Sequence, residues 1–263
     1  MSPPGLATDL APYLERPLAP VERELAMAVA RGPMDPVDAL ALSDLDRLLD
    51  PAPLAVESGW CTLPDGVGYV AVRAEMPHVS AEMVDWWFDW HPREPVRYRI
   101  WHPRAHLDNS LDPPDRPGAK THWGAVHHPV EDIGTGVVHA RIAFRRPSEL
   151  GFSSDALEEP AVGTIVCGHA GDDTRHMRHT VMVHVFLKQG DGLVLRSRFW
   201  IGAAIRPYGP LGAVGARLLN NRVVRRAMIP AAVPQGLANH CAEEYTNLAS
   251  LLGELHGRFG PGA

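Results

Sequence analysis

A series of short β-type segments in the second half of the chain restricts the fold more than any other sequence feature. β-Branched and aromatic residues dominate four successive runs, VVHARIAFRRP, AVGTIVCG, TVMVHVFLKQ and LVLRSRFWIGA, which turn residues separate. No long helical crossover lies between consecutive runs, although parallel strands require such a connection. The sequence therefore predicts a mostly antiparallel sheet.

Helical and further strand patterns surround this sheet. A strand is predicted over 66–76, and a helix follows Ser80 because Met83, Trp86, Trp87 and Trp90 recur at helical spacing. Alternating or β-rich segments predict strands over 96–103 and 120–131. Amphipathic patterns predict one helix over 209–229 and a long closing helix over 233–259.

The amino-terminal part has a different composition. Residues 1–58 are rich in Pro, Ala, Leu and Asp, and short helical patterns alternate with proline-containing breaks. We predict a small helical domain over 1–58, ending in a linker over 50–58, and a second domain over 59–263. The order strand, helix, curved sheet and long helix is typical of an α+β helix-grip fold with a deep cavity. A plain α+β domain with a filled core is the alternative.

Charge and composition exclude several classes of protein. The formal net charge is −6 and the isoelectric point is near 6.1, which argues against a basic surface for nucleic acid or membranes. No uncharged apolar run approaches the roughly 20 residues that span a bilayer. Cys61, Cys167 and Cys241 lack metal-ligand spacing and indicate neither a disulfide framework nor a zinc ribbon. We expect a cytoplasmic protein.

Histidines make the region after residue 77 the place to look for chemistry, since none of the 14 occurs before His78. His240 and Glu244 are four residues apart on the predicted closing helix, so both lie on one face and fit a metal ion. A pair of this kind is more often solvated or hydrogen-bonded. Other histidines, such as His91 and His256, are interpreted as ordinary surface or loop residues.

Three further segments carry candidate residues. In RYRIWHPRAHLDN, strand alternation points Tyr98 inward, His102 fits a turn, and His106 has no evident structural task. Glu131 and Asp132 end a strand, where carboxylates are usually solvated, but flanking apolar residues leave either able to turn inward. His184 lies in an apolar alternating strand, where a histidine is more often a core residue than a catalytic one.

Five motifs together resemble the 2,4-diacetylphloroglucinol hydrolase family, which also includes phloretin hydrolase. They occur in the order EMVDWWFDWH, RYRIWHPRAHLDN, VEDIG, LRSRFWIG and ANHCAEE. The resemblance covers most of the chain after Gly59. It implies a zinc-dependent hydrolase that cleaves the carbon–carbon bond between an acyl group and a polyhydroxylated aromatic ring. It also implies a Bet v 1-like (START-like) helix-grip fold and a homodimer formed through the small helical domain.

The resemblance also assigns residues to roles. It implies His106, Glu131, His240 and Glu244 as zinc ligands, and zinc lowers the pKa of water toward about 7. It places Tyr98 and Asn109 beside the ring hydroxyls and His184 in the cavity wall. We expect His184 and Tyr98 to hold or move the phenolic proton and Asn109 to orient a hydroxyl. Phe199 occupies a position where some relatives carry a second tyrosine. The alternatives are a binding protein without activity and a metal-free polyketide cyclase or aromatase.

Overall fold

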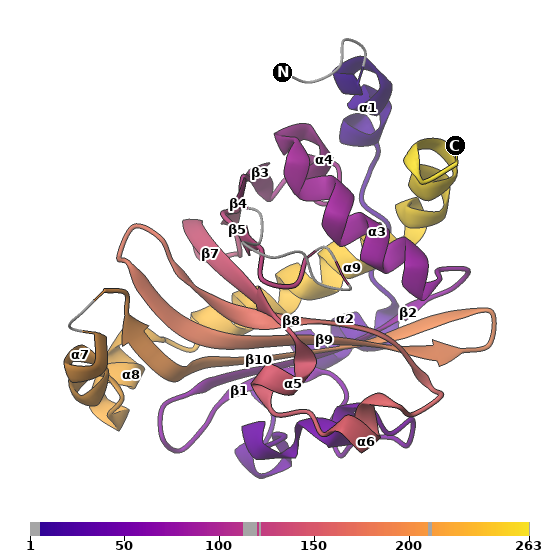
Figure 1. The fold of residues 1–263 in the computed structure, drawn as a ribbon. Coiled ribbons are helices and arrows are strands. Elements are labelled where there is room, and N and C mark those ends of the chain that lie inside the picture. The colour runs from indigo at the N-terminus through magenta and orange to yellow at the C-terminus, as the bar shows by residue number, and fades with distance from the viewer. Residues whose placement is uncertain (1–5, 113–119, 121, 210–211, 263) are drawn as a thin grey trace.

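An antiparallel sheet forms the centre of the molecule in the computed structural model, which describes residues 6–112, 120, 122–209 and 212–262 (Figure 1). Within these residues ten strands pair in the order β1-β2-β10-β9-β8-β7-β5-β4, and the pair β3 and β6 joins through β7. The strands are β1 Gly59–Thr62, β2 Gly68–Met76, β3 His106–Asp108, β4 Leu111–Asp112, β5 Val126–His127, β6 Val130–Asp132, β7 Val137–Arg145, β8 Val162–Asp172, β9 Met177–Gln189 and β10 Gly192–Pro207.

The longest strands are joined by a tight turn. Gly192 pairs with Gln189, so only Gly190 and Asp191 connect β9 to β10. Gly190 has a φ of 57°, a conformation that glycine adopts without a side-chain clash. Because the turn is this short, the two alternating runs on either side of the Gly-Asp-Gly segment fold as neighbouring strands.

Side-chain alternation divides the sheet residues between two hydrophobic clusters. Val70 and Val72 of β2 face the cluster that includes the long helix α9, Ala232–Phe259. Tyr69 and Ala71 belong to the cluster on the opposite face, together with Leu45 and other residues of the amino-terminal segment. Both faces of the central strands are therefore buried, which is why these strands are almost continuously apolar.

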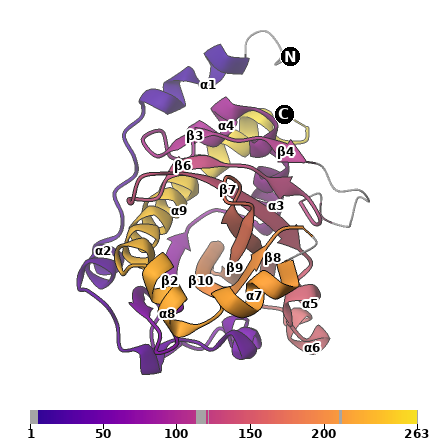
Figure 2. The same cartoon turned by 90° about the vertical axis from the view of Figure 1, so that its left-hand side faces the viewer.

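Helices cover the sheet and its edges. Helix α9 runs along one face, as both ribbon views show (Figure 1 and Figure 2). Helix α3, Ala81–Trp90, packs against α9 and begins at Ser80, whose hydroxyl accepts a hydrogen bond from the amide of Met83 at 3.3 Å. The remaining helices are α1 Leu6–Glu15, α2 Arg23–Ala30, α4 Pro95–Arg99, α5 Pro147–Leu150, α6 Ser154–Leu157, α7 Gly212–Leu219 and α8 Arg222–Met228, with 3-10 turns at Pro36–Asp38, Leu42–Leu48 and His91–Arg93.

The predicted Bet v 1-like helix-grip class is wrong. The described residues form a large antiparallel sheet with helices, which is an α+β fold. The prediction rested on the family resemblance and on the order of the elements along the chain, and that order fixes neither the number of strands nor their arrangement in space. The short strands β3 to β6, which extend the sheet beyond β7, have no clear period in the sequence.

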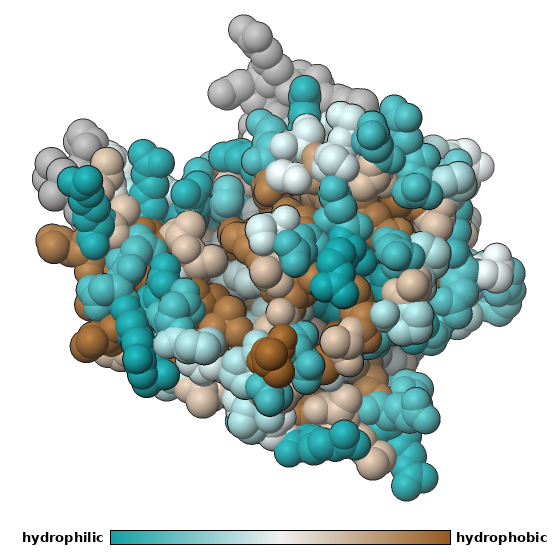
Figure 3. All heavy atoms as spheres, turned by 90° about the horizontal axis from the view of Figure 1, so that it is seen from below, coloured by the Kyte–Doolittle hydropathy of each residue, from teal (hydrophilic) through white to brown (hydrophobic). Residues whose placement is uncertain are grey.

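Two local predictions were also wrong. Residues Pro95–Arg99 form the helix α4 instead of a strand, because Pro95 occupies the first helical turn, where its fixed φ favours a helix. The single helix expected over 209–229 is two helices, since Asn221 accepts hydrogen bonds from the amides of Val223 and Val224 and so begins α8. Leu218 and Val223 are exposed there, and hydrophobic side chains are visible over α7 and α8 at the left of Figure 3.

The domain boundary at residue 58 stays a prediction. The amino-terminal segment is attached to the rest of the chain by specific contacts: the Tyr13 hydroxyl donates to Glu254 Oε1 of α9 at 2.7 Å. The predicted linker over 50–58 also contacts β10, because the Arg196 guanidinium donates to the carbonyl of Ala52 at 2.8 Å and to Glu57 Oε1 at 2.7 Å. Among the described helices, none combines the length and apolar character needed to cross a membrane.

Candidate active site

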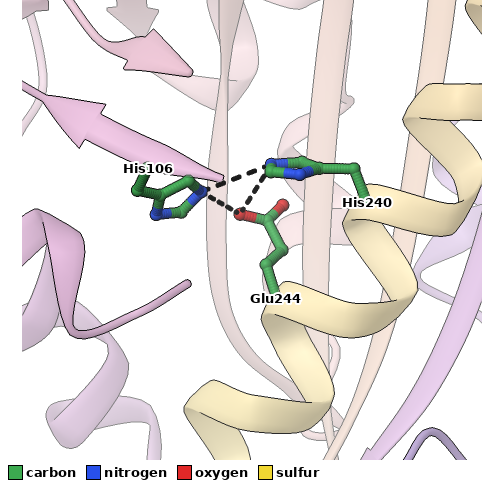
Figure 4. Close-up of side chains that lie close together, drawn as sticks. All are labelled: His106, His240 and Glu244. Atoms are coloured by element: carbon green, nitrogen blue, oxygen red, sulfur yellow. Dashed lines mark hydrogen bonds and ion pairs between the residues drawn. The ribbon is translucent and has the colours of Figure 1, made fainter. Parts of the chain in front are cut away.

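Three potential metal ligands meet between β3 and α9. His106 Nε2 lies 3.3 Å from His240 Nε2 and 3.6 Å from Glu244 Oε2, and His240 Nε2 lies 3.8 Å from the same carboxylate oxygen (Figure 4). His240 and Glu244 project from successive turns of α9, as their spacing predicts. All three residues are buried, and their nitrogen and oxygen atoms lie within 4.8 Å of one another. This group can hold a metal ion.

Glu131 lies beside the same group. Strand β6 pairs with β3 so that Glu131 is directly opposite His106. Its Oε2 atom lies 3.6 Å from His106 Nε2 and 3.6 Å from His240 Nε2. The structure therefore brings together all four residues that the resemblance implies as ligands, although their role as zinc ligands stays a prediction. We call these four residues the metal group.

Contacts with backbone carbonyls and with a neighbouring ring orient the metal group. His106 Nδ1 lies 3.1 Å from the carbonyl oxygen of Tyr98, which can only accept, so Nδ1 carries the hydrogen and Nε2 presents its lone pair to the group. The ring of His102 stacks on His240 with centroids 5.3 Å apart. Trp101 Nε1 donates to the carbonyl of Glu244 at 2.8 Å and fixes this turn of α9.

Burial and charge set the protonation of the group in the absence of an ion. Burial raises the pKa of Glu244 to about 8. Burial opposes charge on His240, but the hydrogen bond with Glu131 and the two carboxylates outweigh it and raise the pKa of His240 to about 9. Burial likewise opposes ionisation of Glu131, but the hydrogen bond with His240 and the positive charge of His240 outweigh burial and lower the pKa of Glu131 to about 2. A protonated His240 thus supplies positive charge that a cation would replace.

The donor set fits a borderline divalent ion. Two imidazoles and two carboxylates are ligands that zinc accepts, and the metal group supplies no thiolate. Catalytic zinc sites usually have three protein ligands and keep one open position. A weakly held carboxylate would keep one coordination position open here. The arrangement is therefore that of a candidate catalytic metal centre.

A cavity of about 180 Å³ opens beside the metal group. Glu131, His240 and Glu244 line one part of it, and most of the remaining wall is apolar, including Phe199 and Met182 on the sheet. Such a cavity suits a small aromatic ligand that is anchored by a few polar groups.

Comparison with known proteins gives the family. Residues 40–257 match the sequence model of the DAPG hydrolase PhiG domain, which is more than half of the chain. The chain belongs to the DAPG hydrolase PhiG family. Phloretin hydrolase of Eubacterium ramulus is 30% identical over 252 residues, covering 93% of this chain and 88% of that protein. The 2,4-diacetylphloroglucinol hydrolase of Pseudomonas protegens is 31% identical over 242 residues, covering 88% and 78%.

Family membership confirms the predicted resemblance and the prediction of a hydrolase. Solved structures give only weak similarity. Protein CV1439 from Chromobacterium violaceum has a TM-score of 0.38 and 10% identity, covering 72% of this chain and 98% of that one. Protein Ms6760 from Mycobacterium smegmatis has a TM-score of 0.29 and 14% identity, covering 66% and 91%.

In this family member, the three residues predicted to contact substrate all line the cavity. The Tyr98 hydroxyl donates a short hydrogen bond to Glu131 Oε2, and its ring stacks on His106 with centroids 4.0 Å apart. His184 Nδ1 lies 2.5 Å from Ser197 Oγ, and burial lowers the pKa of His184 to about 3. The Asn109 carboxamide is buried, and neither of its polar atoms has a hydrogen-bond partner among the described residues.

Two cavity residues were missed by reasoning from the sequence. His91, expected on the surface, is 1% exposed and lines the cavity of this family member, as does the buried His127. His91 follows Trp87 by four residues, and its Nδ1 lies 2.7 Å from the Trp87 carbonyl oxygen. That spacing continued the apolar face of the predicted tryptophan-rich helix and was the available signal for burial.

Proposed function

We propose that this family member hydrolyses the carbon–carbon bond between an acyl group and a phloroglucinol-type ring, with zinc held by His106, Glu131, His240 and Glu244. Diacetylphloroglucinol and phloretin are the first substrates to consider because the two relatives are named for hydrolysing them. The observation that carries the proposal is the convergence of four nitrogen and oxygen ligands, three of them from buried residues, at the wall of an apolar cavity.

The reaction needs a proton on the ring as well as a nucleophile at the acyl carbon. When the bond breaks, the hydroxyl of water ends on the acyl carbon and a proton ends on the ring carbon that carried it. An aryl carbanion is a very poor leaving group, so ring protonation has to precede cleavage. Zinc, when bound, supplies a Lewis acid that polarises oxygen ligands and makes water more acidic.

His184 is the residue we assign to the phenolic proton. Its ring is neutral because burial lowers its pKa to about 3, so it keeps a lone pair with which it accepts a hydrogen bond from a ring hydroxyl and holds the phenolic proton in place. The nearby Ser197 hydroxyl fixes the ring in place. A hydrogen bond from the phenolic hydroxyl to His184 polarises the O–H bond, pushes electron density toward the acyl-bearing carbon and favours its protonation.

Tyr98 and Asn109 position the ring. Burial raises the pKa of Tyr98 well above 10, with the Glu131 charge adding to the effect, so its hydroxyl stays a hydrogen-bond donor at the metal group. The Asn109 carboxamide has no hydrogen-bond partner within the described ranges and offers an NH2 donor group and a carbonyl acceptor to a ring hydroxyl. The apolar wall excludes water, which strengthens each of these hydrogen bonds.

The test is incubation of the zinc-loaded chain with mono- and diacetylphloroglucinol and with phloretin, followed by chromatography and metal analysis. We expect acyl release by the wild type, and loss of both zinc and turnover in His240→Ala. His256→Ala is the matched control, because His256 lies on α9 but contacts Trp86 instead of the metal group. Full turnover by a metal-free His240→Ala variant would overturn the assignment. Ligand binding without turnover would favour a binding protein, and a homodimer in the cytoplasm stays part of the proposal.

A further inference from the structure

A row of ring contacts, some stacked and some edge-to-face, leads from the metal group into the cavity wall. Tyr98 stacks on His106 with centroids 4.0 Å apart, and the His91 centroid lies 6.0 Å from that of Tyr98. His127 follows, 5.5 Å from His91, and contacts Phe144 at 4.5 Å. His91 and His127 both line the cavity, and their ring contacts connect them to His106 through Tyr98. The proposed mechanism assigns no role to either histidine.

The hydrogen bonds of His91 fix which ring nitrogen is free. Its Nδ1 lies 2.7 Å from the Trp87 carbonyl oxygen, and a carbonyl only accepts, so Nδ1 carries the hydrogen. Burial lowers the pKa of His91 to about 3, so the ring is neutral and Nε2 keeps its lone pair. No hydrogen bond to this Nε2 occurs among the described residues. His91 therefore presents a fixed acceptor that protein groups in the described part of the chain leave unused.

His127 is a second unused polar group beside it. The side chain is 3% exposed, and its Nε2 has no hydrogen-bond partner within the part of the chain that the structure describes. Burial lowers the pKa of His127 well below 6.5, so this ring is neutral as well. Buried polar groups are normally hydrogen-bonded, and orphaned ones at a cavity wall indicate a ligand that completes them.

We propose that His91 Nε2 accepts a hydrogen bond from the ring hydroxyl para to the acyl group of the bound substrate, with His127 as its neighbour at this end of the cavity. The inference rests on the proposed function and refines its substrate class. If the acyl carbonyl lies at the metal group, the ortho hydroxyls lie near Tyr98 and His184. The para hydroxyl is the substituent farthest from the acyl carbon, and in this orientation it is the one left to reach His91 and His127 in the cavity wall.

This arrangement selects against rings without a para hydroxyl. A ligand that lacks the hydroxyl leaves the buried Nε2 unpaired, whereas one that carries it satisfies both partners. A methyl ether at that position has no hydrogen to donate and also fails. His91 would thus be a specificity-determining residue that contacts substrate without taking part in proton transfer.

The test compares binding of three acetophenones to the zinc-loaded full chain by rapid-mixing tryptophan fluorescence. Trp87 and Trp101 contact His91 and report occupancy without requiring turnover. We expect 2,4,6-trihydroxyacetophenone to bind about ten- to a hundredfold more tightly than 2,6-dihydroxyacetophenone. In His91→Phe this ratio should fall to about one. The ratio between 2,4,6-trihydroxyacetophenone and 2,4-dihydroxyacetophenone should not change, because both keep the para hydroxyl.

Two further variants control for packing. His91→Gln places a carboxamide near the position of Nε2 and should restore part of the preference lost in His91→Phe. His256→Phe alters a histidine that contacts Trp86 and does not line the cavity, so it should leave every ratio unchanged. Equal wild-type binding of the first two ligands, or an unchanged ratio in His91→Phe, would overturn the proposal. Para-selective binding without acyl release would instead contradict only the proposed function.

Discussion

Metal binding should release protons, and the number follows from the protonation of the metal group. In the ion-free protein the pKa of His240 is raised to about 9 and that of Glu244 to about 8, so both are mostly protonated at pH 7. Glu131, with a pKa lowered to about 2, and His106, with a pKa lowered well below 6.5, are already deprotonated. A metal ion requires all ligands deprotonated, so binding at pH 7 should expel about two protons.

The pH dependence has a definite sign and size. Protons compete with the metal below the raised pKa values, so affinity should rise with pH and level off above about pH 9. With two protons released, the binding free energy should become more favourable by about 2.7 kcal/mol per pH unit near pH 7. This slope is large enough to measure over a single pH unit.

Isothermal titration calorimetry in buffers of different ionisation enthalpy, with a competing chelator, gives the proton count. Glu244→Gln should release about one proton, since it removes one of the two titrating groups. Glu254→Gln is the matched control, because Glu254 lies on the same helix but pairs with Arg16 at 3.1 Å on the surface. A wild-type count near zero, or the same count in Glu244→Gln, would refute the reasoning.

Three other predictions follow from the described contacts. His184→Ala should lower kcat about a hundredfold with metal content unchanged, and loss of metal in this variant would make His184 structural or a ligand. Glu57→Gln should reduce the free energy of unfolding by about 3 kcal/mol in urea titrations, because it leaves Arg196 and Arg198 without their counterion; an unchanged midpoint would contradict this. Burial raises the pKa of Glu57, but hydrogen bonds from Arg196 outweigh it and lower the pKa. The stabilisation by the Glu57 ion pairs should therefore be present at neutral pH and be lost as the pH falls through the lowered pKa. A stabilisation that stays constant between pH 7 and 3 would contradict the assignment.

The fold was predictable where a single period dominated the sequence. The alternating runs of β7 to β10 and the long apolar face of α9 followed directly from their patterns. The helix α4 did not, because RYRI alternates like a strand while Pro95 favours a helical turn. Tyr98 and Ile100 are buried in either case, so the inward position of Tyr98 was predicted correctly from an incorrect element.

The site was predictable only in part for a related reason. The spacing of His240 and Glu244 places them on one helix face, but nothing local shows that β3 and β6 bring His106 and Glu131 to that face. In the sequence, only the family resemblance links the four positions. His91 was misread because a histidine beside a proline is typical of a loop, whereas its ring packs among Trp87 and Trp101.

Anomalous diffraction at the zinc edge from crystals of the zinc-loaded protein tests the central claim most directly. The account predicts one strong peak between His106, Glu131, His240 and Glu244, with ligand distances of about 2.0 to 2.2 Å. Crystals of His240→Ala grown and loaded in the same way should lose this peak. Zinc bound elsewhere in the wild type, with no peak among these side chains, would contradict the account.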